Sequence, residues 1–182
     1  QNEEDIPRTI ELLNSDKRKH QKIEVSLGFI GAGNYASRVL IPAFRKNCAN
    51  LDTVVSTGGL NGMNSAKKFA FRKAGSSADE VLRDSNIDAV IISTRHDSHG
   101  KLVLQALENK KHVFVEKPLC LTDEELSEIQ TTYAQNAEKP VLMVGFNRRF
   151  SPLVKVMQNC LTKVSAPKSM IMTVNAGAIP GD

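Results

Sequence analysis

The sequence has 182 residues, enough for one domain or for one domain with part of a second. Hydrophobic residues make up 41% and charged residues 24%, and the net charge of +4, with no tryptophan and two tyrosines, argues against a nucleic-acid-binding surface. No apolar run is long enough to span a membrane and no signal peptide opens the chain, so we expect a cytoplasmic protein without membrane or nucleic-acid partners.

Residues 1–22 form a polar lead that carries the basic run Lys17–Lys22. Ile6, Ile10 and Leu13 are spaced so that they fall on one helical face, which predicts a partly helical leader or linker. The sequence begins with glutamine rather than methionine, so we expect it to be an excised piece of a longer polypeptide.

From residue 23 onward, short apolar runs alternate with helical patterns. The expected strands are 23–30, 51–57, 87–93, 112–115 and 141–145. The expected helices are 34–46, 63–71, 98–109 and 122–137, with capping boxes at Ser77–Glu80, which starts a further short helix, and at Thr122–Glu125. This alternation predicts an α/β fold, a Rossmann-type doubly wound parallel sheet with helices on both faces. Such sheets bind ligands outside the carboxyl ends of their strands.

A second domain is expected to begin near residue 148. An amphipathic helix over 152–163 and a strand over 168–176 follow the last strand of the predicted sheet, and the sequence then stops. We therefore divide the chain into a leader (1–22), a Rossmann-type domain (23–147) and the truncated start of a further α/β domain (148–182).

Gly31–Ala36 follows the first strand and opens a helix, the context that a dinucleotide-binding turn requires. Gly31 permits the tight turn, Gly33 has no side chain to block a pyrophosphate, and Ala36 allows close helix–strand packing. The helix N-terminus would offer N–H groups to the phosphates. The alternative is a glycine turn without a ligand. We predict that the cofactor contacts Gly31, Gly33, Asn34, Tyr35 and Ala36.

The end of the second strand bears on the choice of dinucleotide. An NAD-binding domain commonly places a carboxylate there to chelate the adenosine ribose. Here the strand ends in Ser56 and Thr57, and the nearest carboxylate, Asp52, lies at its other end. Ser56 and Thr57 can hydrogen-bond either cofactor, so the prediction is NAD or NADP.

Ser93–His99 places polar residues between a buried strand and a helix. Two interpretations compete with cofactor binding: His96 and His99 as metal ligands, and Asp97 or Ser98 as a helix N-cap. No further acidic or histidine partner lies nearby, and the cysteines lack metal-ligand spacing, so we predict no metal and reduced thiols. We predict that the residues beside the ribose or phosphates of the cofactor are Ser93, Thr94, Arg95 and His99.

These motifs resemble those of the glucose–fructose oxidoreductase/inositol dehydrogenase (Gfo/Idh/MocA) family. The resemblance covers residues 24–176 and is carried by Gly31-x-Gly33-Asn34-x-Ala36, Ser93-Thr94 with His99, Glu116-Lys117-Pro118, and Val144–Phe150. The sequences of Ser93–His99 and Val174–Pro180 resemble one branch of this family more closely. In that branch this module follows a zinc-type alcohol dehydrogenase module in one polypeptide.

The resemblance implies a Rossmann domain followed by a larger α/β domain. It also implies an NAD(P)-dependent oxidoreductase that transfers a hydride between the cofactor and the CH–OH group of a sugar, a nucleotide-linked sugar or a polyol. In such enzymes the lysine corresponding to Lys117 lies beside the nicotinamide and accepts the hydroxyl proton as the hydride leaves. Glu116 would position the loop or the lysine, and Asn147, together with Arg148, would approach the nicotinamide or the substrate.

The resemblance further implies a cis peptide between Lys117 and Pro118. The alternative interpretations are an ordinary exposed lysine before a turn proline, and a polar interdomain hinge at Asn147. Many members of the family carry proline where this chain has Arg95. The second catalytic segment of the family has no counterpart before Asp182, so we expect the chain alone to be inactive.

For the full-length parent we expect a small sugar-like substrate and a homo-oligomer. One alternative function is a non-enzymatic NAD(P)-binding sensor or corepressor, against which the intact Glu116-Lys117-Pro118 motif weighs. Another is a scaffolding domain whose glycine turn is empty.

Overall fold

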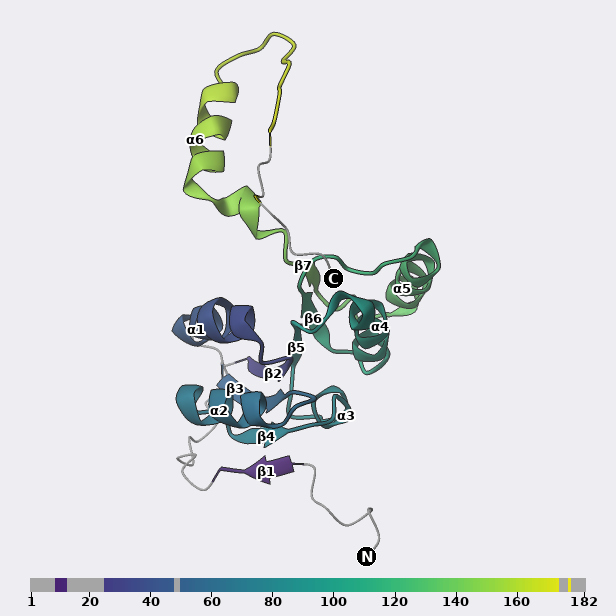
Figure 1. Cartoon of the computed structure of the whole chain (residues 1–182). Coiled ribbons are helices and arrows are strands. Elements are labelled where there is room, and N and C mark those ends of the chain that lie inside the picture. The colour runs from purple at the N-terminus through teal and green to yellow at the C-terminus, as the bar shows by residue number, and fades with distance from the viewer. Residues whose placement is uncertain (1–8, 13–24, 48–49, 174–176, 178–182) are drawn as a thin grey trace, which may run out of the picture. The chain divides into compact units, whose positions relative to one another are not determined.

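A computed structural model describes residues 9–12, 25–47, 50–173 and 177 of the chain (Figure 1). The chain divides into two compact units, Gln1–Phe146 and Asn147–Asp182. This division falls next to the domain boundary predicted after residue 147.

The first unit is built on one sheet whose seven described strands have the order β1-β4-β3-β2-β5-β6-β7. The strands are β1 (Thr9–Glu11), β2 (Ser26–Ile30), β3 (Asn50–Val55), β4 (Lys73–Gly75), β5 (Ala89–Ile92), β6 (His112–Val115) and β7 (Leu142–Val144). All neighbours pair in parallel except β1, which runs antiparallel to β4. The predicted Rossmann-type parallel sheet is therefore confirmed.

Six strands end in one row across the sheet, since Gly75 of β4 is level with Val55 of β3. Ile30 of β2 is in register with Val55 of β3 and with Ile92 of β5. Ile92 is in turn level with Val115 of β6, and Val115 with Val144 of β7. The residues that follow this row share the carboxyl edge of the sheet: Gly31, Ser56, Ser76, Ser93, Glu116 and Gly145.

Helices cover both faces of this sheet (Figure 1), and each face has its own core cluster of buried side chains. Helices α1 and α2 pack on one face, and α3, α4 and α5 on the other. Along β2 the side chains alternate, so that Phe29 joins the first cluster and Ile30 the second. The helices are α1 (Ile41–Lys46), α2 (Leu60–Phe69), α3 (Asp79–Leu82), α4 (His99–Glu108) and α5 (Asp123–Gln135).

The helix that follows the glycine turn is wound in two parts. Ala36–Leu40 is a π-helix, in which the Ile41 N–H donates to the Ala36 carbonyl, and α1 continues from it. Pro42 has no N–H to give to the Arg38 carbonyl, so regular α-helical bonding cannot run through this segment. The wider turn accommodates the proline without ending the helix.

The helical face predicted for the leader is wrong at Ile10. Thr9–Glu11 forms β1 and pairs with Lys73–Gly75, the other strand that the sequence pattern does not predict. Ile6 and Leu13 lie outside the described residues. Both strands have only three residues, which is too short for an alternating pattern to be recognised.

Two predicted capping boxes start helices, but each differs in detail from the reciprocal pattern. At α5 the Thr122 hydroxyl accepts the Glu125 N–H at 3.2 Å, while the Glu125 carboxylate accepts the N–H of Leu121. At α3 the Glu80 carboxylate accepts the Ser77 N–H at 3.2 Å and also bonds the Thr9 hydroxyl of β1.

The second unit contains a 3₁₀ turn, Asn147–Phe150, and α6 (Pro152–Leu161), which confirms the helix predicted over 152–163. The predicted strand 168–176 is absent over 168–173, and residues 174–176 lie outside the described part of the chain. A strand needs a hydrogen-bonded neighbour, and the described residues of this unit contain none.

The predicted free thiols are present at Cys120 and Cys160, and Cys48 lies outside the described residues. Burial raises the pKa of the Cys120 thiol. In the part of the chain that the structure covers, every helix is too short or too polar to cross a membrane.

Candidate functional site at the carboxyl edge of the sheet

Gly31 begins the turn after β2 in a conformation that only glycine adopts readily. Its φ is +102°, and its N–H donates to the Val55 carbonyl at 2.9 Å. A Cβ at this position would lie 2.6 Å from the Ser93 carbonyl oxygen. The Ser93 hydroxyl donates to the Gly31 carbonyl at 3.1 Å, which holds the ends of β2 and β5 together. The neighbouring strand leaves no room for a side chain at Gly31.

Gly33 faces open space instead. A Cβ added there would meet no atom within 4 Å, and the Gly33 carbonyl accepts the Ser37 N–H at 2.9 Å as the helix begins. Ala36 is buried beneath the turn and lets the helix pack closely on the sheet. The backbone of the turn is therefore open to a ligand on the side where Gly33 lacks a side chain.

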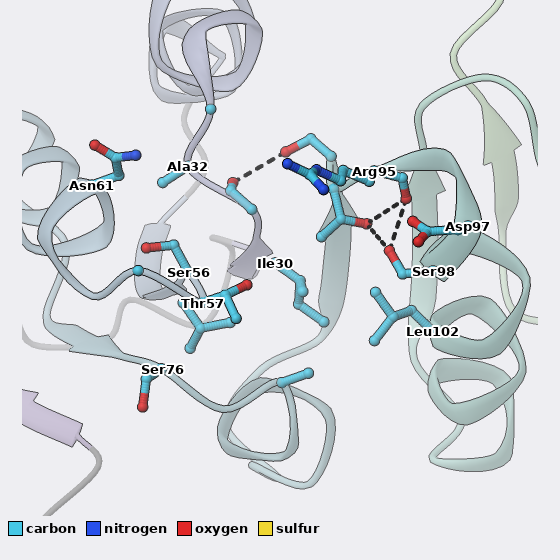
Figure 2. A pocket seen from close by; sticks show the side chains of 17 residues that line it. Ile30, Ala32, Ser56, Thr57, Asn61, Ser76, Arg95, Asp97, Ser98 and Leu102 are labelled. Atoms are coloured by element: carbon cyan, nitrogen blue, oxygen red, sulfur yellow. Dashed lines mark hydrogen bonds between the residues drawn. The ribbon is translucent and has the colours of Figure 1, made fainter. Parts of the chain in front are cut away.

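A cleft of about 850 Å³ opens between the ends of β2, β3 and β5 (Figure 2). Its volume is in the range of cofactor and small-molecule sites. The predicted residues that line it are Gly31, Gly33, Ser56, Thr57, Ser93, Thr94 and Arg95. The sequence therefore predicts most of the polar wall that the fold brings together.

Ser56 and Thr57 form one side of the cleft (Figure 2). The Ser56 hydroxyl accepts the Gly62 N–H at 2.9 Å, which ties it to the start of α2, whereas Thr57 is exposed. Among the described residues, no carboxylate lines this side of the cleft. Asp52 is fully buried, and Arg72 donates to it at 2.7 Å, a hydrogen bond that raises the pKa of Arg72. Asp52 is thus committed to an ion pair with Arg72, whose side chain is partly exposed.

Arg95, Asp97 and Ser98 lie on the opposite side of the cleft (Figure 2). Ser98 has the position of the α4 N-cap, as one interpretation expects, but its side chain does not cap the helix. Its hydroxyl instead donates to the Arg95 carbonyl at 2.8 Å and lies 2.6 Å from the Thr94 hydroxyl. These bonds fix the turn and leave the Arg95 and Asp97 side chains exposed.

His99 does not lie where the sequence predicts it. Its side chain is fully buried and is absent from the lining of the cleft. Nδ1 lies 2.6 Å from the Pro118 carbonyl oxygen, and Nε2 lies 3.3 Å from the Thr94 carbonyl oxygen. His99 is the first residue of α4, and its two ring contacts place the side chain inward beneath the two loops rather than in the cleft.

Lys117 is exposed at the end of β6, and the predicted cis peptide to Pro118 is confirmed. The preceding Glu116 N–H donates to the Ile92 carbonyl at 2.9 Å. Its carboxylate is packed over Gly145, where a Cβ would lie 2.7 Å from Glu116 Oε1. This oxygen is buried and has no hydrogen-bond partner among the described residues. Lys117 does not itself line the cleft but follows β6, the neighbour of β5.

A smaller hollow of about 360 Å³ adjoins the cleft at Gly33. The side chains that line this hollow include those of Asn34, Asn61 and Lys68. Tyr35 lies on the surface, with 38% of its area exposed, and lines neither space. Asn147 belongs to the second unit, and its role stays a prediction.

Several residues that line the cleft are not among those predicted to contact the cofactor. They are Ile30, Ala32, Val55, Gly58, Asn61, Ser76, Ala78, Asp97, Ser98 and Leu102. Asn61 has a recognisable signal, because it lies in the first turn of a helix that follows a strand end. Ser76 and Ala78 follow β4, and without that strand their position at the sheet edge could not be inferred. Across the described ranges, no group of three or more His, Cys, Asp or Glu side chains is placed to hold a metal ion.

The sequence of this chain is similar to those of known oxidoreductases. A scyllo-inositol 2-dehydrogenase (NAD⁺) of Bacillus subtilis is 40% identical over 87 residues, which cover 48% of this chain and 25% of that protein. A 1,5-anhydro-D-fructose reductase of Ensifer adhaerens is 33% identical over 102 residues, which cover 56% of this chain and 31% of that protein. The chain therefore spans less than a third of the length of either relative.

A solved structure shares the fold over most of the chain. The myo-inositol dehydrogenase from Lactobacillus casei, in complex with NAD(H) and myo-inositol, superposes on this chain with a TM-score of 0.70 at 27% sequence identity. The superposition covers 78% of this chain and 42% of the dehydrogenase chain. Residues 25–146 match an oxidoreductase family with an NAD-binding Rossmann fold. The chain belongs to this family, Gfo/Idh/MocA.

Proposed function

We propose that the chain is the nucleotide-binding part of an NAD(P)-dependent oxidoreductase that acts on the CH–OH group of a sugar, a nucleotide-linked sugar or a polyol. One observation carries the proposal: the open backbone at Gly33 and the exposed Lys117 lie at the same edge of one sheet. A turn that admits a dinucleotide and a group that exchanges a proton are the two parts that this reaction requires.

The residues of the cleft fit a dinucleotide. The turn from Gly31 to Gly33 provides backbone close to an open space, as a pyrophosphate needs. Ser56 and Thr57 offer hydroxyl groups for the adenosine ribose, and the turn of Thr94 forms the opposite wall. Since no described carboxylate lies beside Thr57 in the lining of the cleft, both NAD and NADP remain compatible with the site.

The cofactor, when bound, supplies hydride transfer. The chain's own contribution would come from Lys117. As hydride leaves a carbinol carbon the hydroxyl becomes acidic, and a neutral lysine amine accepts its proton. In the reverse direction the ammonium donates this proton to the carbonyl oxygen. Glu116 would hold the loop that presents Lys117, because its carboxylate is buried against Gly145.

The substrate class follows from the relatives, whose names state an inositol and an anhydro-sugar as substrates. Most of each relative's length has no counterpart in these 182 residues, so we propose that residues of a further domain, beginning at about Asn147, complete the substrate wall. The fusion to a zinc-type alcohol dehydrogenase module, a homo-oligomeric parent and a cytoplasmic location belong to the same proposal. None of the described features favours a non-enzymatic sensor.

The test uses the protein expressed from the complete reading frame that contains this sequence. Oxidation of a panel of cyclitols and sugars would be followed by the absorbance of NADH or NADPH. Lys117→Ala should lower kcat by about a hundredfold or more, as for loss of a general base. Lys101→Ala, which removes an exposed lysine of α4, is the matched control. If Lys117→Ala keeps full turnover, or wild type transfers hydride to no member of the panel, the proposal fails.

A further inference from the structure

His99 connects the two loops that the proposed reaction needs. It begins α4, and its side chain is fully buried between the turn after β5 and the turn after β6. Nδ1 lies 2.6 Å from the Pro118 carbonyl oxygen, and Nε2 lies 3.3 Å from the Thr94 carbonyl oxygen. Thr94 lines the cleft, and Pro118 directly follows Lys117. A single ring therefore contacts both the cofactor wall and the lysine turn.

The two contacts of the ring are not equivalent. A separation of 2.6 Å between Nδ1 and a carbonyl oxygen requires a proton on Nδ1, because both atoms otherwise present lone pairs to each other. The contact between Nε2 and the Thr94 carbonyl oxygen is longer, at 3.3 Å, and is therefore the weaker of the two. The bond that anchors a loop is therefore the one from Nδ1–H to Pro118.

The backbone around Lys117 is held on both sides. Before it, the Glu116 N–H donates to the Ile92 carbonyl at 2.9 Å. After it, the Pro118 carbonyl accepts the proton of His99 Nδ1. Lys117 itself is exposed, so its backbone anchors, rather than side-chain packing, decide where its amine is presented.

We propose that His99 is a positioning residue for Lys117, acting through the bond from Nδ1–H to the Pro118 carbonyl. The inference rests on the proposed function, because a fixed lysine matters only where the lysine exchanges a proton with a substrate. In this role His99 supports both loops from the buried side and does not make the cofactor contact that the sequence predicts.

Three substitutions separate the anchor from the volume of the ring, in the protein expressed from the complete reading frame. His99→Asn places an amide donor near the Nδ1 position, His99→Gln places one near the Nε2 position, and His99→Leu keeps bulk without a donor. His96→Leu is the control, because His96 is an exposed histidine of the same turn. Thermal unfolding checks that each variant is folded. Should the leucine variant not fold, the asparagine and glutamine variants carry the same comparison.

We expect His99→Leu and His99→Gln to lower kcat by about 10- to 100-fold, the scale expected for a displaced catalytic group. The dissociation constant of NADH should change by less than kcat does. His99→Asn and His96→Leu should stay within about threefold of wild type in kcat. Amide hydrogen exchange in Glu116–Leu119 should accelerate in the leucine and glutamine variants alone.

Two results would overturn the inference: an asparagine variant as impaired as the leucine variant, or a leucine variant with normal kcat. Hydrogen exchange decides separately if wild type turns over no substrate. Faster exchange in Glu116–Leu119 of the leucine and glutamine variants, but not of the asparagine variant, supports the anchor although the proposed function has failed. Equal exchange in all variants shows that His99 does not hold the turn.

Discussion

Replacing Gly33 with valine should abolish cofactor binding while leaving the fold intact. A Cβ at Gly33 meets nothing within 4 Å, so the valine side chain enters open space rather than the core. We expect the free energy of unfolding to change by no more than about 0.5 kcal/mol, as for a surface substitution. The same open space is where the pyrophosphate would approach the turn, and the isopropyl group would fill it.

The loss of binding can be estimated from the contacts that the valine prevents. Two hydrogen bonds from backbone N–H groups to a charged pyrophosphate contribute about 1.5–3 kcal/mol each. Losing both weakens binding by about 3–6 kcal/mol, which is roughly a hundredfold to ten-thousandfold in the dissociation constant. Calorimetric titration with NADH and NADPH measures this change directly.

Gly31→Ala is the control for Gly33→Val, because it should lower the stability of the fold instead of blocking the cofactor site. Its Cβ would lie 2.6 Å from the Ser93 carbonyl oxygen, at a φ of +102°. We expect a cost of about 1–3 kcal/mol in the fold itself, which lowers Tm by roughly 2–12 °C. An unchanged dissociation constant in Gly33→Val would refute the placement of the pyrophosphate at this turn. A large loss of Tm in the same variant would show that Gly33 is needed for the fold instead.

Two further predictions concern cofactor choice and acid stability. Thr57→Asp should weaken binding of NADPH by about tenfold relative to NADH, because a carboxylate at this edge repels a 2′-phosphate; titration of both cofactors checks it, and equal losses would place the adenosine ribose elsewhere. Burial works to raise the pKa of Asp84, but hydrogen bonds from Asn86 and Lys73 outweigh it and lower the pKa below 3.8. The stabilisation from Asp84 is therefore present above this value and is lost as the pH falls through the folded-state pKa. Asp84→Asn should cost about 1–2 kcal/mol in urea unfolding at pH 7 and progressively less below about pH 4, and a cost that does not depend on pH would contradict this assignment.

The central strands could be predicted because burial on both faces makes them continuously apolar. Val90, Ile91 and Ile92 of β5 are all buried, and β6 begins and ends where the sequence pattern predicts. The glycine turn could also be predicted, because its requirements are local: a left-handed φ at Gly31 and an absent side chain at Gly33.

The parts that could not be predicted depend on contacts between distant segments. β1 exists because Thr9–Glu11 pairs with β4, and three residues carry no periodic signal. His99 has the sequence context of a surface turn, and only the position of Pro118, fixed by the fold, shows that its ring points inward. The buried oxygen of Glu116 likewise follows from the approach of Gly145, which comes directly after the neighbouring strand β7.

Cofactor binding in the cleft is tested most directly by titrating the isotope-labelled chain with NADH and following its backbone amide resonances. We expect the largest shifts at Gly31, Gly33, Thr57 and Thr94, which surround one cleft at the carboxyl edge of the sheet. Absence of shifts at millimolar NADH, or shifts concentrated away from these residues, would contradict the claim that this cleft holds the cofactor.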